Sequence, residues 1–443
     1  MKYSVLALAV TAAMLAQQVN ASGFIDDSKA NLRLRNLYIN QDNRDSGTPK
    51  NNNYQAEWGQ GFILDFSSGY TPGEVGFGVD AIGILGIKLD SSSAKHGNPT
   101  GNAYGGIMFP SDANHAVDEF SSLGLAAKMK ISKTEIKLGT LTPKTPVIFS
   151  NDGRLAPQTW QGGQITSGDV KDLTLTAGQI EKVKGRNSSN NENLSVGGAN
   201  NAISGTFSNK FLFAGGDYKL TKDLTLQYYY GNLDNFYKQH FLGLTYNWSV
   251  GPGIFKTDLR YFNSKGDGLN TNDPAYFTTG YYGDKAIKGR VDNDLYSGLF
   301  LYTLGGHTFG GGYESSRGDS DFPWLNQGDG GSTYLITDSL IQKFGRPGEK
   351  TWQARYAYDF AAAGLPGATA SIVYLKGNGI DTPDTSNASE WERDITLAYV
   401  VQNGPLKGFG VMLRNASVRN SNLPTVRQQD ESRVILSYQL ALF

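Results

Sequence analysis

Apolar and polar residues alternate along much of this chain, and the last stretch shows the pattern most clearly. Residues 432–443 read SRVILSYQLALF, and alternate positions form an apolar face: Val434, Leu436, Tyr438, Leu440 and Leu442. The opposite face is mostly polar and begins with Arg433, because successive side chains of a strand point to opposite sides. A soluble β-sandwich can use such a strand. Its position at the end of a long chain, with a terminal aromatic residue, favours the closing strand of a membrane β-barrel, which needs lipid-facing residues outside and polar ones inside.

Short turn sequences divide the rest of the chain into pairs of alternating runs. They lie at 71–73, 132–134, 169–172, 221–223, 251–253, 305–307, 364–367 and 403–407. Long stretches rich in Asn, Asp, Gly and Ser separate them, at 91–118, 187–201, 265–290, 315–331 and 378–389. This asymmetry is typical of outer-membrane barrels. Eight turns delimit nine hairpins and predict an all-β, 18-stranded antiparallel transmembrane β-barrel, with sixteen strands as the alternative because the count depends on every turn.

The N-terminus predicts an exported protein. Lys2 precedes the apolar run 5–15, and Val19-Asn20-Ala21 resembles a cleavage site, so residues 1–21 are expected to be a signal peptide and 22–443 the barrel. No later stretch reaches the roughly 20 apolar residues that a spanning helix needs. The 55 Gly, 24 Tyr and 22 Phe, with only 39% hydrophobic residues, fit many alternating strands instead.

Composition excludes several kinds of chemistry. The formal net charge of −1 gives no electrostatic reason to expect a nucleic-acid partner. The chain has no Cys, and its four His show no metal-ligand spacing, so we expect no metal and no cofactor. Residues 76–81 (GFGVDA) match a dinucleotide-binding pattern, but they lie in an alternating strand with no helix after it.

One loop is suited to narrowing the lumen that so wide a barrel leaves. Residues 141–160 (LTPKTPVIFSNDGRLAPQTW) hold three of the 15 prolines and the apolar run Val147-Ile148-Phe149. Proline stiffens a loop, and apolar residues favour packing against a wall over exposure to water. We therefore predict an inward-folded constriction loop.

The alternation also predicts which cations face the lumen. A cation facing lipid at mid-membrane costs roughly 2–4 kcal/mol, so arginines on strands are expected to point inward. Six arginines fall on lumenal faces by this criterion: Arg33, Arg35, Arg260, Arg355, Arg414 and Arg433.

Several motifs resemble the OprD family of outer-membrane carboxylate channels, and together they cover the mature chain in order. They are 23–36 (GFIDDSKANLRLRN), 58–62 (WGQGF), 75–90 (VGFGVDAIGILGIKLD), 131–139 (ISKTEIKLG), 151–159 (NDGRLAPQT), 348–367 (GEKTWQARYAYDFAAAGLPG) and 399–408 (YVVQNGPLKG). The resemblance implies an 18-stranded porin in the outer membrane of a Gram-negative bacterium, which passes small carboxylate nutrients along an arginine-lined track. Residues 213–225, 238–244 and 391–394 resemble the branch that handles aromatic and other cyclic carboxylates.

The resemblance also implies particular solute-binding residues. Arg154 on the constriction loop and Arg186 would join Arg414 and Arg433 in the family's ladder of basic residues, whereas Met412 stands where some members have a further arginine. Asp319 and Asp321, in a second loop, are candidates for acidic groups that orient the solute. Each of these charged residues also fits a structural role, in which the arginines hold a loop in place and the aspartates are solvated.

The leading hypothesis is therefore passive, selective uptake of small carboxylates, with no catalytic residues. Channels for amino acids or peptides and general porins of the same fold are alternatives. A barrel enzyme, a secreted glycan-active β-protein and an adhesive barrel are more distant ones. The expected partners are carboxylate solutes, outer-membrane lipid and lipopolysaccharide, and the expected assembly is a monomer or a weak homotrimer.

Overall fold

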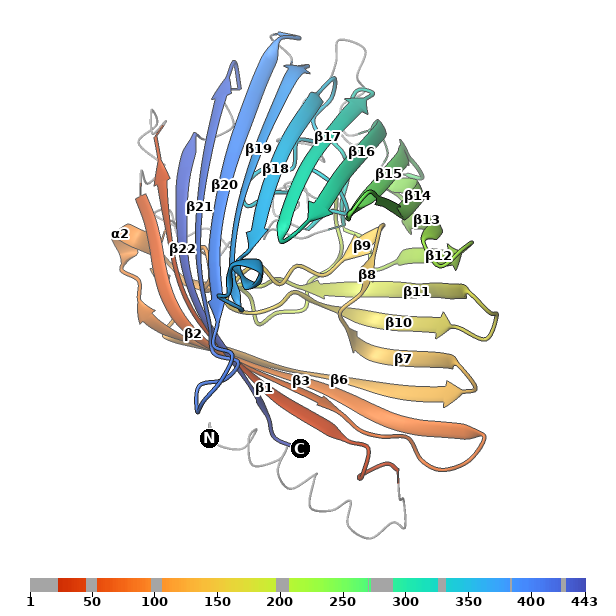
Figure 1. The fold of residues 1–443 in the computed structure, drawn as a ribbon. Coiled ribbons are helices and arrows are strands. Elements are labelled where there is room, and N and C mark those ends of the chain that lie inside the picture. The colour runs from red at the N-terminus through yellow and green to blue at the C-terminus, as the bar shows by residue number, and fades with distance from the viewer. Residues whose placement is uncertain are drawn as a thin grey trace.

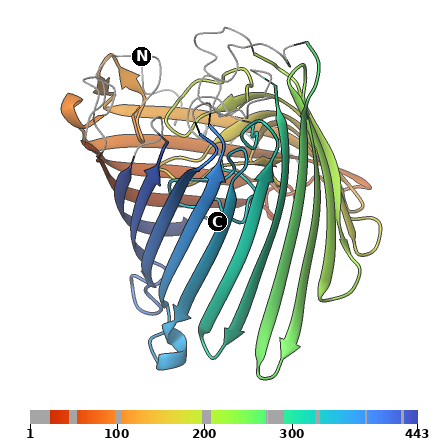
Figure 2. The ribbon, with the colours of Figure 1, turned by 90° about the horizontal axis from the view of Figure 1, so that it is seen from above.

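Eighteen strands form one closed antiparallel sheet in the computed structural model (Figures 1 and 2). The structure describes residues 23–44, 54–96, 106–196, 207–269, 271, 290–325, 332–382, 385–423 and 428–443. The predicted signal peptide, residues 1–21, lies outside these ranges.

The barrel strands follow one another in chain order around the wall. They are β1 (Lys29–Asn43), β2 (Tyr54–Ser67), β3 (Val75–Asp90), β6 (Glu119–Ile131), β7 (Thr134–Leu141), β10 (Thr159–Ser167), β11 (Leu173–Lys184), β12 (Phe211–Lys219), β13 (Leu224–Leu233), β14 (Tyr237–Val250), β15 (Gly253–Gly266), β16 (Asp292–Leu304), β17 (His307–Arg317), β18 (Lys350–Asp359), β19 (Ala368–Ile380), β20 (Ala388–Val400), β21 (Gly410–Ser421) and β22 (Gln429–Ala441). The connections hold α2 (Ser93–His96), β4 (Ser111–Asp112), β5 (His115–Ala116), β8 (Lys144–Thr145), β9 (Ile148–Phe149) and the 3-10 turn η2 (Phe360–Ala363).

The last strand closes the barrel against the first, as the sequence predicts. In the β1–β22 register, Arg33 lies opposite Gln439 and Arg35 lies opposite Ser437. Closure leaves the sheet without an open edge, which is the condition for a β-structure to exist in lipid. The count of 18 strands is confirmed and the alternative of sixteen is wrong.

The eight predicted short turns all join neighbouring strands at one end of the barrel. One of the two-residue turns is Gly305-Gly306 between β16 and β17, where both residues adopt positive φ, a conformation that glycine takes without steric cost. Several of these turns lie along the lower edge of Figure 2. The connections at the other end are mostly long, but the one between β13 and β14, residues 234–236, is short.

The two faces of the wall differ as the alternation predicts. On β22, Val434 is exposed on the outside, whereas its neighbour Arg433 is only 5% exposed and faces the interior. Leu242, Leu397 and Leu413 are similarly exposed on the outside of other strands. Among the described residues, no helix is both long and apolar enough to span a membrane.

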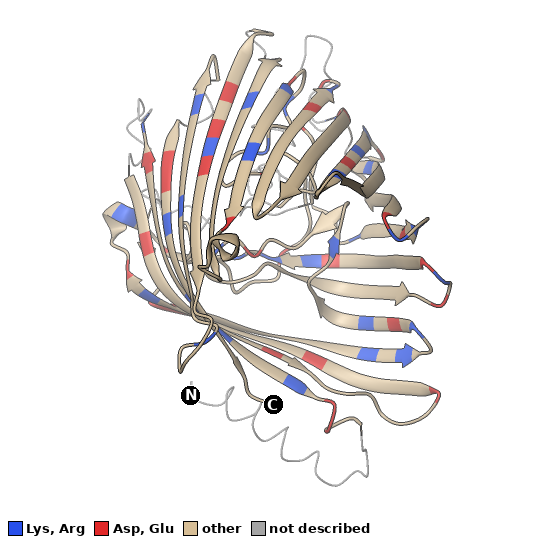
Figure 3. Cartoon of the chain, viewed as in Figure 1, with Lys and Arg blue, Asp and Glu red and all other residues tan. Residues whose placement is uncertain are grey.

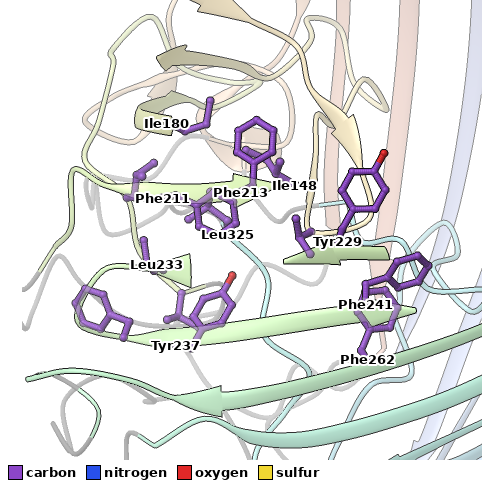
Figure 4. Close-up of a cluster of buried hydrophobic side chains, with 14 of the residues drawn as sticks. Ile148, Ile180, Phe211, Phe213, Tyr229, Leu233, Tyr237, Phe241, Phe262 and Leu325 are labelled. Carbon is purple, nitrogen blue, oxygen red and sulfur yellow. The ribbon is translucent and has the colours of Figure 1, made fainter. Parts of the chain in front are cut away.

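Part of the interior is apolar, which differs from the expectation of polar inward faces. Phe211, Phe213, Phe241 and Phe262 point inward from β12, β14 and β15 and are fully or almost fully buried (Figure 4). They are buried because two loops fold into the lumen and cover them. Alternation alone cannot predict which inward positions a loop will cover.

Candidate functional site

The predicted constriction loop, residues 142–158 between β7 and β10, folds into the barrel. Its first part contains the small hairpin β8–β9, in which Lys144 pairs with Phe149. The amide of Ser150 donates to the carbonyl of Pro143 at 2.8 Å, and the amide of Gln158 donates to the carbonyl of Asn151 at 2.8 Å. These bonds give the loop a defined shape although it carries little regular secondary structure.

Apolar residues at both ends anchor the loop to opposite parts of the wall. Val147 and Ile148 join the cluster of inward phenylalanines on β12–β15, where Figure 4 shows Ile148 beside Phe213. Leu155 and Ala156 join a second cluster on β1, β2, β3 and β6 that includes Phe109. The apolar residues that marked the loop in the sequence are therefore its two anchors, and the polar tip between them lies in the lumen.

Two glycines of the WGQGF motif allow the second anchor to approach β2. A Cβ atom at Gly61 would lie 2.9 Å from the carbonyl oxygen of Leu155, and one at Gly59 would lie 2.6 Å from the ring of Phe109. Contacts this short do not occur in folded proteins without displacement. Glycine at these positions thus lets the loop pack directly against the strand.

Arg33 and Arg35 reach from β1 to the tip of the loop. Arg35 donates to Asp152 at 2.8 Å and to the carbonyl of Arg154 at 2.6 Å. Arg33 makes a bidentate pair with Asp65 at 2.5 and 3.0 Å and a longer bond to Asp152 at 3.4 Å. Both arginines point inward, and their contacts with Asp152 and Arg154 hold the constriction loop in place.

The connection between β17 and β18 holds a second loop, whose described residues 318–325 and 332–349 also fold inward. Arg260 pairs with Asp258 at 2.8 Å, donates to the carbonyl of Tyr334 at 2.8 Å and stacks its guanidinium 4.0 Å from the Tyr334 ring. Arg355 donates to the carbonyl of Ile336. These two lumenal arginines therefore support the second loop from the wall.

Carboxylates on β20 bind the same loop from the other side. Glu392 accepts from the successive amides of Ile341 and Gln342 at 2.9 and 2.7 Å, and Asp394 accepts from the amide of Leu340 at 3.2 Å. This acidic row is not among the site residues predicted from the sequence. Its signal was the alternation in 389–394 (SEWERD), which puts three carboxylates on one face of a strand. Figure 3 shows acidic and basic bands along this part of the wall.

A polar cavity of about 820 Å³ lies between the two loops and the wall of β19–β22. Five cations line it: Arg154, Arg186, Lys343, Arg414 and Arg433. Its acidic lining residues are Asp152, Glu192, Asp338 and Asp394. No aromatic side chain lines the cavity among the residues that the structure describes.

Arg414 and Arg433 lie directly opposite each other on β21 and β22. Like charges in this position destabilise a sheet, so their presence needs a compensating partner. Arg433 has such partners: it donates to Glu431 at 2.5 Å, to the carbonyl of Gly153 at 3.3 Å and to the carbonyl of Leu340 at 3.0 Å, and so joins the two inward loops. Arg414 differs, because its Nε is buried and has no hydrogen-bond partner among the described residues.

The other two cavity arginines come from the loops. Arg186 follows β11 and donates to Asn151 at 3.0 Å, which ties it to the constriction loop. Arg154 lies 4.0 Å from Glu431 and is therefore close to the Arg433 group. The structure thus brings Arg154, Arg186, Arg414 and Arg433 to one cavity, although they are far apart in sequence.

The remaining predicted site residues lie away from the cavity in the described part of the chain. Arg33, Arg35, Arg260 and Arg355 contact the loops as described above. The amide of Asp319 donates to the carbonyl of Asp292, and Asp321 lies near Arg346. Burial lowers the pKa of Arg346, but the carboxylates of Glu390, Asp321 and Glu349 outweigh this effect and raise it. The acidic residue that this loop presents to the cavity is Asp338.

Asp338 gives the cavity a pH-dependent charge. Burial raises its pKa above the usual range, although Lys343 at 3.8 Å and the amide of Thr333 at 2.8 Å partly offset this effect. The carboxylate therefore takes up its proton at a higher pH than an ordinary aspartate, whose pKa is about 3.9. As the pH falls, the cavity loses a negative charge and its preference for anions should rise.

We expect Asp338→Asn to raise anion over cation permeability at neutral pH and to abolish most of this pH-dependent rise. Reversal potentials in a KCl gradient, measured from neutral to acid pH, test both effects. Asp118→Asn is the matched control, since Asp118 pairs with Lys88 at 2.7 Å and its side chain is 93% exposed outside the cavity. A pH response of the same size in Asp338→Asn as in the wild type would contradict this role.

A closed 18-stranded barrel with two inward loops around a polar cavity defines a porin with a constricted lumen. The comparisons with known proteins agree. The family model "outer membrane porin, OprD family" matches residues 22–442, so the chain belongs to the OprD family. The resemblance drawn from the sequence motifs is therefore confirmed.

Individual relatives cover nearly the whole chain. The chain is 36% identical over 432 residues to Porin-like protein GalP of Pseudomonas putida, covering 97% of this chain and 96% of that protein. The crystal structure of Pseudomonas aeruginosa OccK8 (OprE) matches with a TM-score of 0.86 and 54% identity, over 95% of this chain and 100% of that one. That of P. aeruginosa OpdK with vanillate matches with a TM-score of 0.82 and 34% identity, over the same shares. These relatives are porins, so the choice of a channel over a barrel enzyme is confirmed.

Proposed function

We propose that this porin admits small carboxylates and that Arg154, Arg186, Arg414 and Arg433 recognise them. The observation that carries the proposal is the convergence of these four arginines on one cavity between the inward loops. Guanidinium stays charged at any working pH, and its planar fork of donors matches a carboxylate. Several moderate sites in a row favour passage, because a solute must be able to leave as readily as it enters.

The residues that line the cavity indicate which solutes, apart from their carboxylate group, it can accept. Vanillate, present in the OpdK structure, is an aromatic carboxylate, and it supports including aromatic and other cyclic carboxylates among the candidates for this chain. The described cavity offers no aromatic side chain on which a ring could stack. We therefore propose that the carboxylate, and not the ring, supplies most of the recognition.

The same proposal includes the route to the membrane and the assembly. Residues 1–21 would be a cleaved signal peptide, and 22–443 the mature porin domain. The porin would be embedded in the outer membrane of a Gram-negative bacterium, among lipid and lipopolysaccharide, as a monomer or a weak homotrimer.

Uptake into proteoliposomes that contain the mature protein tests the substrate class. We expect benzoate to enter about ten- to a hundredfold faster than benzamide, since a hydrogen bond to a charged group contributes about 1.5–3 kcal/mol and about 1.4 kcal/mol corresponds to a factor of ten. Arginine and a neutral sugar serve as comparison solutes. Equal uptake of all four would indicate a general porin, and faster uptake of arginine would indicate a basic-amino-acid channel.

A further inference from the structure

The outside of the barrel carries a groove that the channel function does not use. It lies on β14–β17, four neighbouring strands of the wall in Figure 1. Its volume is about 640 Å³, and its lining includes Leu242, Leu259, Phe300 and Tyr313. These four side chains are 40–52% exposed and have the opposite orientation to the inward Phe241 and Phe262 of the same strands. The groove therefore faces the membrane.

A glycine forms part of the floor of the groove. Gly298 lies opposite Leu259 on β15 and Tyr313 on β17, where its neighbours on the outer face of β16 are Tyr296 and Phe300. A Cβ atom there would already lie 3.2 Å from Leu259. The absence of a side chain at this position leaves a hollow between large apolar residues, which suits a flexible hydrocarbon chain.

The end of the groove toward the long loops is charged. Arg317, the last residue of β17, is exposed and lies with its guanidinium 5.6 Å from the Tyr296 ring. Asp294 lies directly opposite Arg317, but its carboxylate accepts from Tyr261 at 3.0 Å, Asn263 at 2.6 Å and Lys265 at 2.9 Å. No described residue forms an ion pair with Arg317, so an exposed cation lies at the head of an apolar groove.

The height of this cation in the membrane indicates what it meets. The strand β15 gives a measure of this height. Phe255 lies near its short-turn end, and Lys265, which pairs with Asp294, lies ten residues further along the strand. Ten residues span about 33 Å along a strand and, at a tilt of about 40°, about 25 Å along the barrel axis, which is the height of the apolar band of such barrels. Long loops of outer-membrane barrels face outward. Arg317 therefore lies at the level of the outer-leaflet headgroups.

From this arrangement we infer a binding site for a phosphorylated glycolipid of the outer leaflet, of the lipid A class. One acyl chain lies in the groove over Gly298, and a headgroup phosphate accepts charge-assisted hydrogen bonds from Arg317. A second copy of the chain is the competing occupant. The exposed cation, which has no ion-pair partner in the described part of the chain, favours an anionic lipid, because the same face of a second copy would bring a second Arg317 toward the first.

Native mass spectrometry of the detergent-solubilised mature protein tests the site. The protein is titrated with bisphosphorylated hexa-acyl lipid A and, separately, with phosphatidylethanolamine. We expect the wild type to retain lipid A preferentially, and Arg317→Ala to bind it about tenfold to a hundredfold more weakly, the effect of losing a hydrogen bond to a charged group. Gly298→Leu should also lose retention, because it fills the groove, whereas Arg317→Lys should keep part of it.

Matched controls separate the site from general effects on the barrel. Lys222→Ala removes an exposed cation from a short turn, and Ala354→Leu adds bulk to an exposed position on β18 that does not line the groove. Both should retain lipid A like the wild type, and heat-modifiable migration should show that every variant is folded. Carboxylate uptake should be unchanged in all of them, so this test is independent of the proposed channel function.

Three results would overturn the inference. The first is equal retention of lipid A and phosphatidylethanolamine by the wild type, which indicates unselective surrounding lipid. The second is wild-type retention in Arg317→Ala. The third is a loss of oligomer in Gly298→Leu without loss of lipid A, which would assign the groove to an interface between copies.

Discussion

Arg414→Ala is expected to lower benzoate flux about ten- to a hundredfold while benzamide flux stays near the wild-type value. Among the cavity arginines, Arg414 contributes least to holding the loops. Its Nε has no hydrogen-bond partner among the described residues, and its neighbour across the sheet is another arginine, Arg433. Removing it takes away a contact that only a carboxylate can make, worth about 1.5–3 kcal/mol. At about 1.4 kcal/mol per factor of ten, this loss gives the stated range.

The loss of benzoate flux in Arg414→Ala should be smaller if the neighbouring arginines also bind the carboxylate. Lysine at this position should rescue flux only partly, because it keeps the charge and loses the fork of donors. Arg154→Ala and Arg186→Ala should also lower benzoate flux more than benzamide flux. Part of the Arg186 effect should come from the loop, since Arg186 holds Asn151.

A control on the same strand separates recognition from folding. Arg419 pairs with Asp430 at 2.9 Å on the opposite face of β21, so Arg419→Ala removes an arginine without touching the cavity. Its benzoate-to-benzamide ratio should equal that of the wild type. If Arg414→Ala folds and keeps the wild-type ratio as well, Arg414 does not recognise the carboxylate.

The fold could be predicted from the sequence because its determinants are local. Strand alternation and eight short turns depend only on neighbouring residues, and closure follows from the need to leave no open edge in lipid. The inward orientation of Arg33, Arg35 and Arg433 follows from the same alternation. Alternation also puts Glu392 on the inner face, but its contacts with the second loop, like the position of Asp338 on that loop, depend on where the loop packs against the wall.

The candidate site, too, could be predicted only in part from the sequence. Four of the predicted residues, Arg154, Arg186, Arg414 and Arg433, line one cavity, while Arg33, Arg35, Arg260 and Arg355 contact the loops. Alternation places the six predicted strand arginines inside but cannot distinguish those that face the solute from those that contact a loop. That distinction requires the three-dimensional path of residues 142–158, 318–325 and 332–349.

Deleting residues 146–155 is expected to raise single-channel conductance several-fold and to remove most of the preference for benzoate. This segment spans the lumen between the Ile148 and Leu155 anchors and carries Asp152 and Arg154 into the cavity. The barrel should still form, because the pairing of its 18 strands does not include the segment. Bilayer recordings and proteoliposome uptake on the same preparation test both effects, with heat-modifiable migration as the check on folding.

Releasing one anchor separates the width of the pore from its charge. Leu155 is fully buried, and truncating such a leucine to alanine costs about 2–5 kcal/mol. Leu155→Ala should therefore loosen one end of the loop and raise conductance and current noise, while Arg154 and part of the benzoate preference remain. Deleting residues 146–155 should raise conductance more than Leu155→Ala does and should lower the benzoate preference further, because it removes the obstruction and the charges together. Unchanged conductance in a correctly folded deletion variant would show that residues 146–155 do not narrow the pore.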